Sequence, residues 1–344
     1  MNESYYKLIS FFLSFYYLKR VSPIKREKDS DVIKKLHPSK WVKASFKNLK
    51  KTLCSYDVIY TRNEIIDLLL LKLIGYHNLP PIIVGVHTPI RYQIADSIHS
   101  RLHNFLYSKP YKFLLKGVKL IHVVNKFTEE LVNKEFKLIT KKVPYAFSVS
   151  DFHKQAINNK IKIKFDKSKF NIAFIARLTE QKGVSSLINI IDKLSKDVSV
   201  TKRINLNIFG SGDKEQKIKN AAKKYGFVKY FGHVNNKYIP NILSKQDLFI
   251  STAKWESLPF NVLEAQAMGL PVIAFDIYGV NDIVINKKTG LLVNNEEEFI
   301  ECIKKFLSNK IKFSKALIIN HIRKTFDPEI IDKSMLKLFE SVLK

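Results

Sequence analysis

Short apolar runs rich in β-branched residues alternate along this chain with amphipathic stretches of helical spacing. Three such runs occupy 57–61, 81–87 and 118–124 in the first half. A second series has runs at 171–176, 204–210, 228–234, 247–253 and 271–276, with helical spacers at 184–197, 214–225, 237–245 and 260–268. Alternation of this kind predicts an α/β fold in which helices cover parallel sheets.

The two series predict two domains. The segment 145–169 between them is polar and basic with weak periodicity, so we interpret it as a linker. At about 150 residues per domain, a chain of 344 residues has room for two separate cores. We therefore expect two doubly wound, Rossmann-like domains over 1–160 and 161–325 that face a central cleft, followed by a final segment over 326–344.

An apolar run of 11 residues lies near the N-terminus, from Leu8 to Leu18. It is too short to span a bilayer as a helix, which takes about 20 residues. Three interpretations stay open: a buried helix of the first domain, an aromatic interfacial patch flanked by cations, and a signal peptide. We favour the buried helix, because apolar runs of about 10 to 14 residues usually belong to a core.

The chain carries a formal charge of +28, from 59 basic and 31 acidic residues. Such an excess attracts nucleic acid, anionic lipid or phosphorylated substrates and does not choose among them. Only eight of the basic residues are Arg, so the codon bias of an AT-rich genome accounts for the many lysines equally well. The charge is denser in the first part, where residues 1–160 hold 28 basic and 12 acidic residues.

Several classes of site are excluded by what the sequence lacks. The two cysteines, Cys54 and Cys302, lie far apart and no C-x-x-C occurs, which argues against a thiolate zinc site and a disulfide framework. A reducing compartment is the default for such a chain. Neither G-x-S-x-G nor a Walker-type phosphate loop occurs, which excludes those hydrolases and P-loop enzymes at the level of motifs.

The strongest candidate site follows the apolar run 247–253. Pro259 suits the first turn of a helix and Ser257 suits its N-cap, so the free N–H groups of that turn would face a ligand at the mouth of the sheet. Glu256 precedes the helix and Glu264 lies on its second turn. Two carboxylates in this arrangement can bind two parts of one elongated ligand, although ordinary surface glutamates remain the alternative.

Two further motifs follow strands of the same series. Arg177 and Lys182, with Gly183, come directly after the run 171–176 and suit a diphosphate, although solvated loop cations are the commoner case. Gly210 and Gly212 follow the run 204–210 and suit a tight turn or close approach to a phosphate or sugar. All three motifs would lie at the carboxyl ends of strands, where ligands bind in such sheets.

From Asn171 to about Val293, these motifs resemble the nucleotide-sugar-binding domain of the family 4 glycosyltransferases of the GT-B fold. The resemblance includes R-L-x-x-x-K-G, a G-S-G after a strand, Y-F-G-H-V, E-S-L-P-F-N-V-L-E and A-x-G-L-P-V-I-A. The glutamate pair is similar to the E-x7-E signature of that family. The first half matches only by pattern, and the segment from Phe326 onward resembles the C-terminal helix that crosses back to the first domain.

The resemblance implies a role for each matching residue. Arg177 and Lys182 would bind the donor diphosphate, Glu264 the ribose hydroxyls, and Glu256 the hydroxyls of the transferred sugar as a catalytic residue. The other positions would act through the main chain on phosphate, sugar or base, or through close backbone approach: Gly183, Gly210, Gly212, His233, Val234, Leu258, Pro259, Phe260, Asn261 and Val262.

His87 is the second catalytic candidate. It lies in the V-H-T-P stretch after the run 81–87 and matches a first-domain histidine that faces the donor sugar in the family. Because this local motif is short, a loop histidine that only packs remains the alternative.

The activity implied is transfer of a sugar from a nucleotide-sugar to a glycan or lipid-linked acceptor, with retention of configuration, in the synthesis of cell-surface polysaccharide. The departing diphosphate gains negative charge, which Arg177, Lys182 and the helix start near Leu258 can stabilise in place of a metal ion. We therefore expect no cofactor and no metal, with the nucleotide-sugar as a co-substrate.

Two departures from the family pattern affect these expectations. Members begin with a strand and a Gly-Gly loop, whereas this chain opens at Met1-Asn2-Glu3-Ser4-Tyr5. Either the first domain lacks its opening strand or the true start lies upstream of Met1. After the run 271–276, members often read G-G-x-P-E, and only Gly279 matches that pattern here.

The basic first domain and aromatic N-terminus favour an acceptor at an anionic membrane surface. The corresponding location is cytoplasmic, peripheral on the inner face of the cell membrane. Two alternatives stay open: a catalytically impaired, N-terminally truncated nucleotide binder, and a basic nucleic-acid-binding α/β protein. We expect no nucleic-acid partner, because no RNA-binding signature occurs and the charge is spread along the whole chain.

Overall fold

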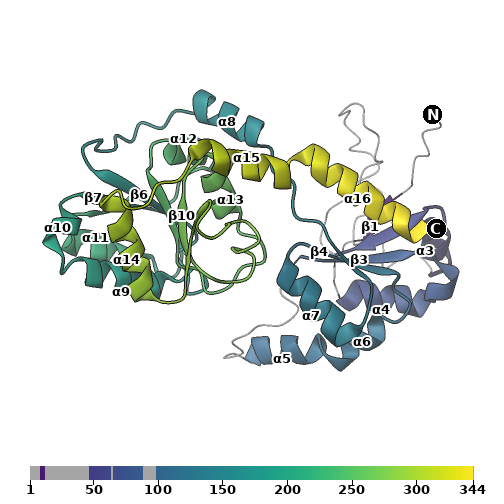
Figure 1. Cartoon of the computed structure of the whole chain (residues 1–344). Helices are drawn as coiled ribbons and strands as arrows, with labels where there is room; N and C mark the ends of the chain where they lie inside the picture. Colours follow the sequence, from purple (N-terminus) through teal and green to yellow (C-terminus); the bar gives the residue numbers. More distant parts are fainter. Residues whose placement is uncertain (1–7, 12–45, 63–64, 88–97, 344) are drawn as a thin grey trace. The chain divides into compact units, whose positions relative to one another are not determined.

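The computed structural model describes residues 8–11, 46–62, 65–87 and 98–343, and they form two compact units. The N-terminal unit comprises residues 1–143 and 333–344, and the C-terminal unit comprises residues 144–332. Each unit is built around its own parallel sheet (Figure 1). The alternation of apolar runs and helical spacers therefore predicted the fold class correctly.

The N-terminal sheet has five described strands in the order β1-β2-β3-β4-β5, and neighbouring strands are parallel. The strands are β1 (Leu8–Phe11), β2 (Val58–Thr61), β3 (Ile82–Val86), β4 (Leu120–Val123) and β5 (Thr140–Lys142). The helices of this unit are α3 (Phe46–Leu53), α4 (Ile65–Ile74), η1 (Tyr76–Asn78), α5 (Ile98–Leu106), α6 (Lys109–Leu114), α7 (Lys126–Phe136) and most of α16 (Pro328–Leu343).

One face of this sheet is covered by α4, α6 and α7, which lie together on one side in Figure 1. Alternate strand residues such as Ile59, Val84 and Ile121 point into this core, because successive side chains in a strand face opposite ways. On the opposite face, the Phe339 ring of α16 packs edge-on against Tyr60 of β2, with ring centroids 6.1 Å apart.

The prediction of a helix over the N-terminal apolar run is wrong for Leu8–Phe11. These residues form β1, which pairs in parallel with β2 at the edge of the sheet. Residues 12–18 lie outside the described residues. The sheet therefore does have a strand ahead of β2. Hydrophobic periodicity alone does not distinguish a strand from a helix in a short apolar run, which is why the prediction failed.

The C-terminal sheet has six strands in the order β11-β10-β9-β6-β7-β8, all parallel to their neighbours. The strands are β6 (Phe170–Ile175), β7 (Ile204–Phe209), β8 (Val228–Tyr230), β9 (Leu248–Ser251), β10 (Val272–Phe275) and β11 (Gly290–Val293). The strand order reverses between β6 and β9, so their carboxyl ends form the topological switch point where ligands bind in doubly wound sheets.

Helices cover both faces of this sheet and enclose two cores (Figure 1). One core includes residues of α9 (Val184–Leu194), α11 (Glu215–Lys224) and α14 (Glu296–Leu307). The other includes residues of α8 (Val149–Asn158), α12 (Ile239–Leu243), α13 (Phe260–Ala267) and α15 (Lys315–Phe326). The short α10 (Val198–Thr201) and η2 (Asn236–Tyr238) complete the unit.

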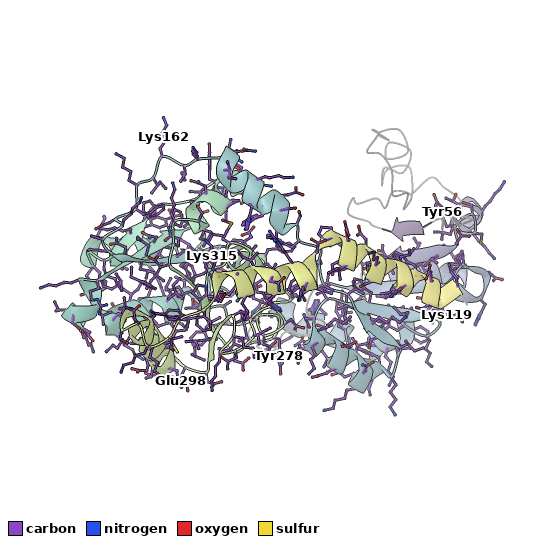
Figure 2. The ribbon with its side chains drawn as sticks, turned by 45° about the horizontal axis from the view of Figure 1, so that its top comes forward. Tyr56, Lys119, Lys162, Tyr278, Glu298 and Lys315 are labelled. Atoms are coloured by element: carbon purple, nitrogen blue, oxygen red, sulfur yellow. The ribbon has the colours of Figure 1, made fainter. Side chains whose placement is uncertain are left out.

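The interpretation of 145–169 as a linker is wrong for its first part. Ser148 caps α8 by accepting a hydrogen bond from the backbone N–H of Asp151. Val149, Phe152 and Ala156 are spaced along one face of α8 and are buried in the C-terminal core. Three apolar residues on one face are enough to bury a short helix in tertiary packing, although they give little periodic signal in the sequence. After α8 the chain runs without helix or strand to β6, and Lys162 on this stretch lies at the outer edge of the unit in Figure 2.

Buried amides join three segments of the C-terminal sheet. Asn207 in β7 donates hydrogen bonds from Nδ2 to Asn171 Oδ1 (3.1 Å) and to Gln246 Oε1 (2.8 Å). The Asn171 backbone N–H donates to Asp247 Oδ2 at 2.7 Å. Such a network fixes the register of β6, β7 and the start of β9, because a buried amide that loses its partner costs about 1–3 kcal/mol.

None of the helices that the structure describes has the length and apolarity needed to span a lipid bilayer.

Candidate functional site

Two loops meet at the switch point of the C-terminal sheet. The loop after β6 carries Lys182, the loop after β9 carries Glu256, and Lys182 Nζ donates directly to Glu256 Oε1. Only 15% of the Lys182 side chain and 9% of the Glu256 side chain remain exposed. The two loops are also joined by the backbone N–H of Lys254, which donates to the Gln181 carbonyl at 2.9 Å. The structure therefore brings together two residues that the sequence assigned to separate motifs.

The close contact between the loops after β6 and β9 requires a glycine at position 183. Its φ is +70°, and a Cβ at this position would lie 1.7 Å from the Thr252 carbonyl oxygen. The Thr252 hydroxyl donates to the carbonyls of Gly183 (2.9 Å) and Lys182 (3.1 Å). Only glycine allows this close approach, so Gly183 fixes where the Lys182 side chain leaves the loop.

The G-S-G motif after β7 packs against the loop after β6. Added Cβ atoms would lie 1.8 Å from the Ala176 carbonyl oxygen at Gly210 and 2.4 Å from the Leu178 carbonyl oxygen at Gly212. The Gly210 N–H donates to the Gly232 carbonyl at 2.8 Å, which ties this loop to the one after β8. The two glycines are therefore explained by contact between loops, as expected for a tight turn.

The two candidates after β8 follow Gly232 directly. His233 is exposed, whereas Val234 is half-buried against the core that contains α13. Their backbone is thus held beside the G-S-G loop, while the His233 side chain faces solvent.

Helix α13 begins at Phe260, as the predicted helical spacer 260–268 has it, but its N-cap lies two residues after the predicted cap Ser257. Pro259 occupies the N-cap position in place of Ser257 and makes no side-chain capping hydrogen bond. Leu258 and Val262 are buried, so they can reach a ligand only through the main chain. Asn261 Nδ2 donates to the Ile175 carbonyl at the end of β6 at 2.9 Å, which holds the helix start beside the loop of Lys182.

Phe260 is the exposed side chain of this helix start. Its ring stacks on Tyr145, with centroids 5.4 Å apart and an interplanar angle of 25°. This pair was not predicted, because Tyr145 lies in the segment interpreted as a linker.

Glu264 lies on the second turn of α13 and is half-buried. Burial raises the pKa of its carboxyl group from the ordinary value to about 7. No neighbouring cation in the described chain offsets this shift, in contrast to Glu256, which has Lys182 as its partner. A carboxylate in this environment is suited to accept hydrogen bonds from a ligand.

Arg177 is exposed and is less firmly held than Lys182. Its Nη2 lies 3.5 Å from Gln181 Oε1 within the same loop. The structure therefore places both cations on the loop after β6, with Lys182 at the ion pair and Arg177 at the surface.

Gly279, in the loop after β10, lies against the loop after β9. Its φ is +79°, and a Cβ here would lie 2.4 Å from the Ser257 carbonyl oxygen and 2.9 Å from that of Glu256. The sequence left this position uncertain because the surrounding motif departs from the family pattern. Its neighbour Tyr278 is exposed (Figure 2).

His87 belongs to the N-terminal unit, at the end of β3. Its Nε2 lies 2.8 Å from the Tyr60 hydroxyl oxygen, and that oxygen lies 2.7 Å from His122 Nδ1. The pKa of His87 is lowered to about 3, chiefly by burial and also by the charges of His122 and Arg62. Sequence reasoning missed Tyr60 and His122, although both are polar residues in otherwise apolar strands.

No group of three or more His, Cys, Asp or Glu side chains suited to a metal ion occurs among the described residues.

Comparison with known proteins places this site in a family. Residues 155–324 match the family described as "Glycosyl transferases group 1". An uncharacterized 41.2 kDa protein in the cps region of Klebsiella pneumoniae is 30% identical over 171 residues, which is 45% of each chain. The UDP-Gal:alpha-D-GlcNAc-diphosphoundecaprenol alpha-1,3-galactosyltransferase of Escherichia coli is 39% identical over 75 residues, 21% of this chain and 19% of that protein. The chain thus spans less than half the length of these curated relatives.

The fold extends over most of the chain. The crystal structure of Anabaena Alr3699/HepE in complex with UDP superposes with a TM-score of 0.65 at 18% identity, covering 86% of this chain and 82% of that one. At this identity the likeness shows the fold.

Proposed function

From a C-terminal unit that is a group 1 glycosyltransferase domain on a GT-B fold, we propose that the chain transfers a sugar from a nucleotide-sugar donor to a glycan or lipid-linked acceptor. UDP is the first nucleotide to test, because the Escherichia coli relative is named for a UDP-Gal donor and the Anabaena structure holds UDP. A role in cell-surface polysaccharide synthesis is supported by the relative in the cps region.

The observation that carries the proposal is the half-buried position of Glu264 on the second turn of α13. Burial raises the pKa of its carboxyl group to about 7, so ionising this group costs free energy. The paired hydroxyls of a ribose would each donate a hydrogen bond to the carboxylate and offset that cost. We therefore assign Glu264 to the ribose of the donor.

The diphosphate is assigned to the loop after β6. Lys182 and Arg177 supply positive charge there, and the N–H groups at the start of α13 add the positive end of a helix dipole. A leaving diphosphate gains negative charge as the glycosidic bond breaks, and these groups would stabilise that charge. On this account transfer needs no metal ion.

The sugar is assigned to Glu256, and His87 keeps the role that the family resemblance implies for it. Glu256 is held in place by Lys182, and it would accept hydrogen bonds from sugar hydroxyls. We propose retention of configuration, with the acceptor attacking on the face from which the diphosphate leaves. No carboxylate is assigned as a nucleophile.

A peripheral site on an anionic membrane is supported by α5 and α6. Ile98, Leu102, Phe105 and Phe113 are 85%, 55%, 63% and 56% exposed, and we call these residues the α5–α6 surface. Between Asp96 and Glu129 the sequence has no acidic residue, whereas the exposed cations on and next to these helices are Arg101, Lys109, Lys112, Lys116 and Lys119. Apolar side chains that enter the interface together with cations that meet anionic head groups are the two requirements for such binding.

The test of the function is nucleotide binding followed by donor hydrolysis. Calorimetry with UDP, GDP and CDP is run on the wild-type chain and on Glu264→Gln, with Glu301→Gln as the matched control because Glu301 is an exposed residue of α14. We expect one nucleotide to bind, Glu264→Gln to weaken it at least tenfold, and the control to bind normally. Folded protein that binds none of them would contradict the proposal, and RNA binding would then be tested.

A further inference from the structure

Three polar rings lie on one face of the N-terminal sheet. Tyr60 in β2 and His122 in β4 alternate with the residues that point into the core of α4, α6 and α7, so both point to the opposite face. Gly85 in β3 pairs with His122 in register, and His87 lies two residues further along, on the same face. A Cβ on Gly85 would lie 2.0 Å from the Tyr60 hydroxyl oxygen, so this glycine makes room for the hydroxyl between the two histidines.

Three hydrogen bonds place the protons of Tyr60 and of the Nε2 atoms of both histidines. His122 Nε2 lies 2.7 Å from the Val143 carbonyl oxygen, which only accepts, so Nε2 carries a proton. In a neutral imidazole Nδ1 then has a lone pair, and it accepts the proton of the Tyr60 hydroxyl at 2.7 Å. Tyr60 has no second proton to give, so its oxygen accepts from His87 Nε2–H at 2.8 Å.

The environment of both histidines favours the neutral ring. Burial lowers the pKa of His122, and it lowers that of His87 to about 3 together with the neighbouring His122 and Arg62. With its proton on Nε2, a neutral His87 has its lone pair on Nδ1. Val143, His122 and Tyr60 thus determine which nitrogen of His87 can accept a hydrogen bond.

We propose that Tyr60 and His122 are positioning residues that hold His87 as the neutral Nε2–H imidazole, in which Nδ1 is the nitrogen that can accept a hydrogen bond from a sugar hydroxyl. The identity of the ligand rests on the proposed function, whereas the placement of the protons does not. In this form His87 accepts a hydrogen bond from a sugar hydroxyl and carries no positive charge.

The protons can be located by nitrogen NMR on the full chain labelled with ¹⁵N-histidine. The chain has nine histidines, and His87→Gln and His122→Gln assign the two signals. We expect both rings to be neutral with the proton on Nε2, and His87 to stay so down to about pH 5, well below the ordinary His pKa of about 6.5. A proton on Nδ1 of His87, or a charged His87 at neutral pH, would overturn the proposal.

Two variants then test the positioning. Tyr60→Phe removes the acceptor for His87 Nε2–H, so the fixed tautomer is lost and the His87 signal becomes a mixture of both forms. His122→Phe removes the acceptor for the Tyr60 proton, so Tyr60 donates to His87 Nε2 and the His87 proton moves to Nδ1. Tyr225→Phe, which deletes a hydroxyl bonded to Asp192 in the other unit, is the matched control and leaves the His87 signal unchanged. Unchanged His87 signals in the folded variants would contradict the positioning role.

A kinetic comparison separates this inference from the proposed function. With the nucleotide-sugar identified by the binding screen, Tyr60→Phe should lower kcat about tenfold, as expected for one lost hydrogen bond, and leave the affinity for the nucleotide unchanged. An unchanged kcat would overturn the catalytic part of the inference. If the wild-type chain hydrolyses and transfers no donor, the proposed function fails, and the NMR result still decides where the proton of His87 lies.

Discussion

Lys182 and Glu256 lie 74 positions apart in the sequence, yet their charged groups are in direct contact at the switch point of the C-terminal sheet. In the proposed function they bind different parts of one donor, the diphosphate and the sugar. In the structure each serves as the partner of the other. The contact therefore links donor binding to stability, because the same two groups contribute to both.

A double variant separates these two contributions. We expect Lys182→Ala to lower the free energy of unfolding by about 2 kcal/mol, because it leaves the mostly buried Glu256 carboxylate without its partner. The second change in Lys182→Ala/Glu256→Gln removes that charge and should restore most of the stability. UDP binding should stay weak in both, since the cation for the diphosphate is missing in each.

Urea unfolding and calorimetry measure the two quantities. Lys219→Ala is the control, because Lys219 forms an exposed ion pair with Glu215 on α11. Exposed pairs contribute at most about 1 kcal/mol, so this variant should keep both stability and UDP binding. Equal effects of the two lysine variants would contradict the role of the Lys182–Glu256 contact.

Glu264 predicts a pH dependence of stability. The folded-state pKa of this carboxyl group is raised to about 7, above the ordinary value of about 4.5. Its protonated form is therefore favoured by folding, and this contribution is complete below about pH 4.5 and is lost as the pH rises to about 7. In Glu264→Gln this contribution is absent, so the stability of the variant relative to wild type should increase over that range.

The same group predicts a pH dependence of nucleotide binding in the opposite direction. Ribose hydroxyls donate to the ionised carboxylate, so UDP affinity should rise as the pH increases through 7. UDP itself also titrates, and this affects wild type and Glu264→Gln equally. The ratio of wild-type to variant affinity, plotted against pH, therefore reports on Glu264 alone. A ratio that stays flat from pH 5.5 to 8.5 would show that Glu264 does not bind the ribose.

Gly183 and Gly226 make a matched pair of glycine substitutions. Gly183→Ala introduces a Cβ 1.7 Å from the Thr252 carbonyl oxygen at a φ of +70°, and we expect it to cost more than about 2 kcal/mol and to abolish UDP binding. Gly226→Ala meets no atom within 4 Å, and its cost should stay within about 0.5 kcal/mol. The urea midpoints of the two variants give the comparison, and similar midpoints would count against the close approach at Gly183.

The proposed stabilisation of the leaving diphosphate by Lys182 and Arg177 predicts independence from metal ions. Hydrolysis of the donor should proceed at the same rate after treatment with EDTA as before it. Loss of activity with EDTA and its return on adding Mg²⁺ or Mn²⁺ would show that the two cations are not sufficient.

Local patterns in the sequence were enough to predict the strands of both sheets that have long apolar runs, and the loops that follow them. They did not reveal β5, whose residues Thr140–Lys142 are polar, or β11, whose apolar run is only three residues long. They also did not reveal helix α8, whose buried face has three apolar residues. The Lys182–Glu256 contact depends on the reversal of strand order between β6 and β9, which no local pattern encodes. The hydrogen-bonded rings of Tyr60, His87 and His122 could have been predicted from the sequence. Tyr60, Gly85 and His122 interrupt apolar strands at positions that share one face of the sheet.

The α5–α6 surface predicts binding to anionic membranes. The full chain should sediment with vesicles of phosphatidylglycerol and phosphatidylethanolamine and should not sediment with phosphatidylcholine vesicles. Leu102→Ser/Phe105→Ser should weaken this binding at least tenfold, because burying one large apolar side chain contributes about 1.5–3 kcal/mol.

Leu317→Ser removes a similarly exposed apolar residue, 47% exposed on α15 of the other unit, and should bind as wild type does. Because each Lys or Arg near the surface contributes about 1 kcal/mol, binding should also fall with added salt. Binding that is equal in wild type and the double variant would locate the membrane contact outside α5 and α6.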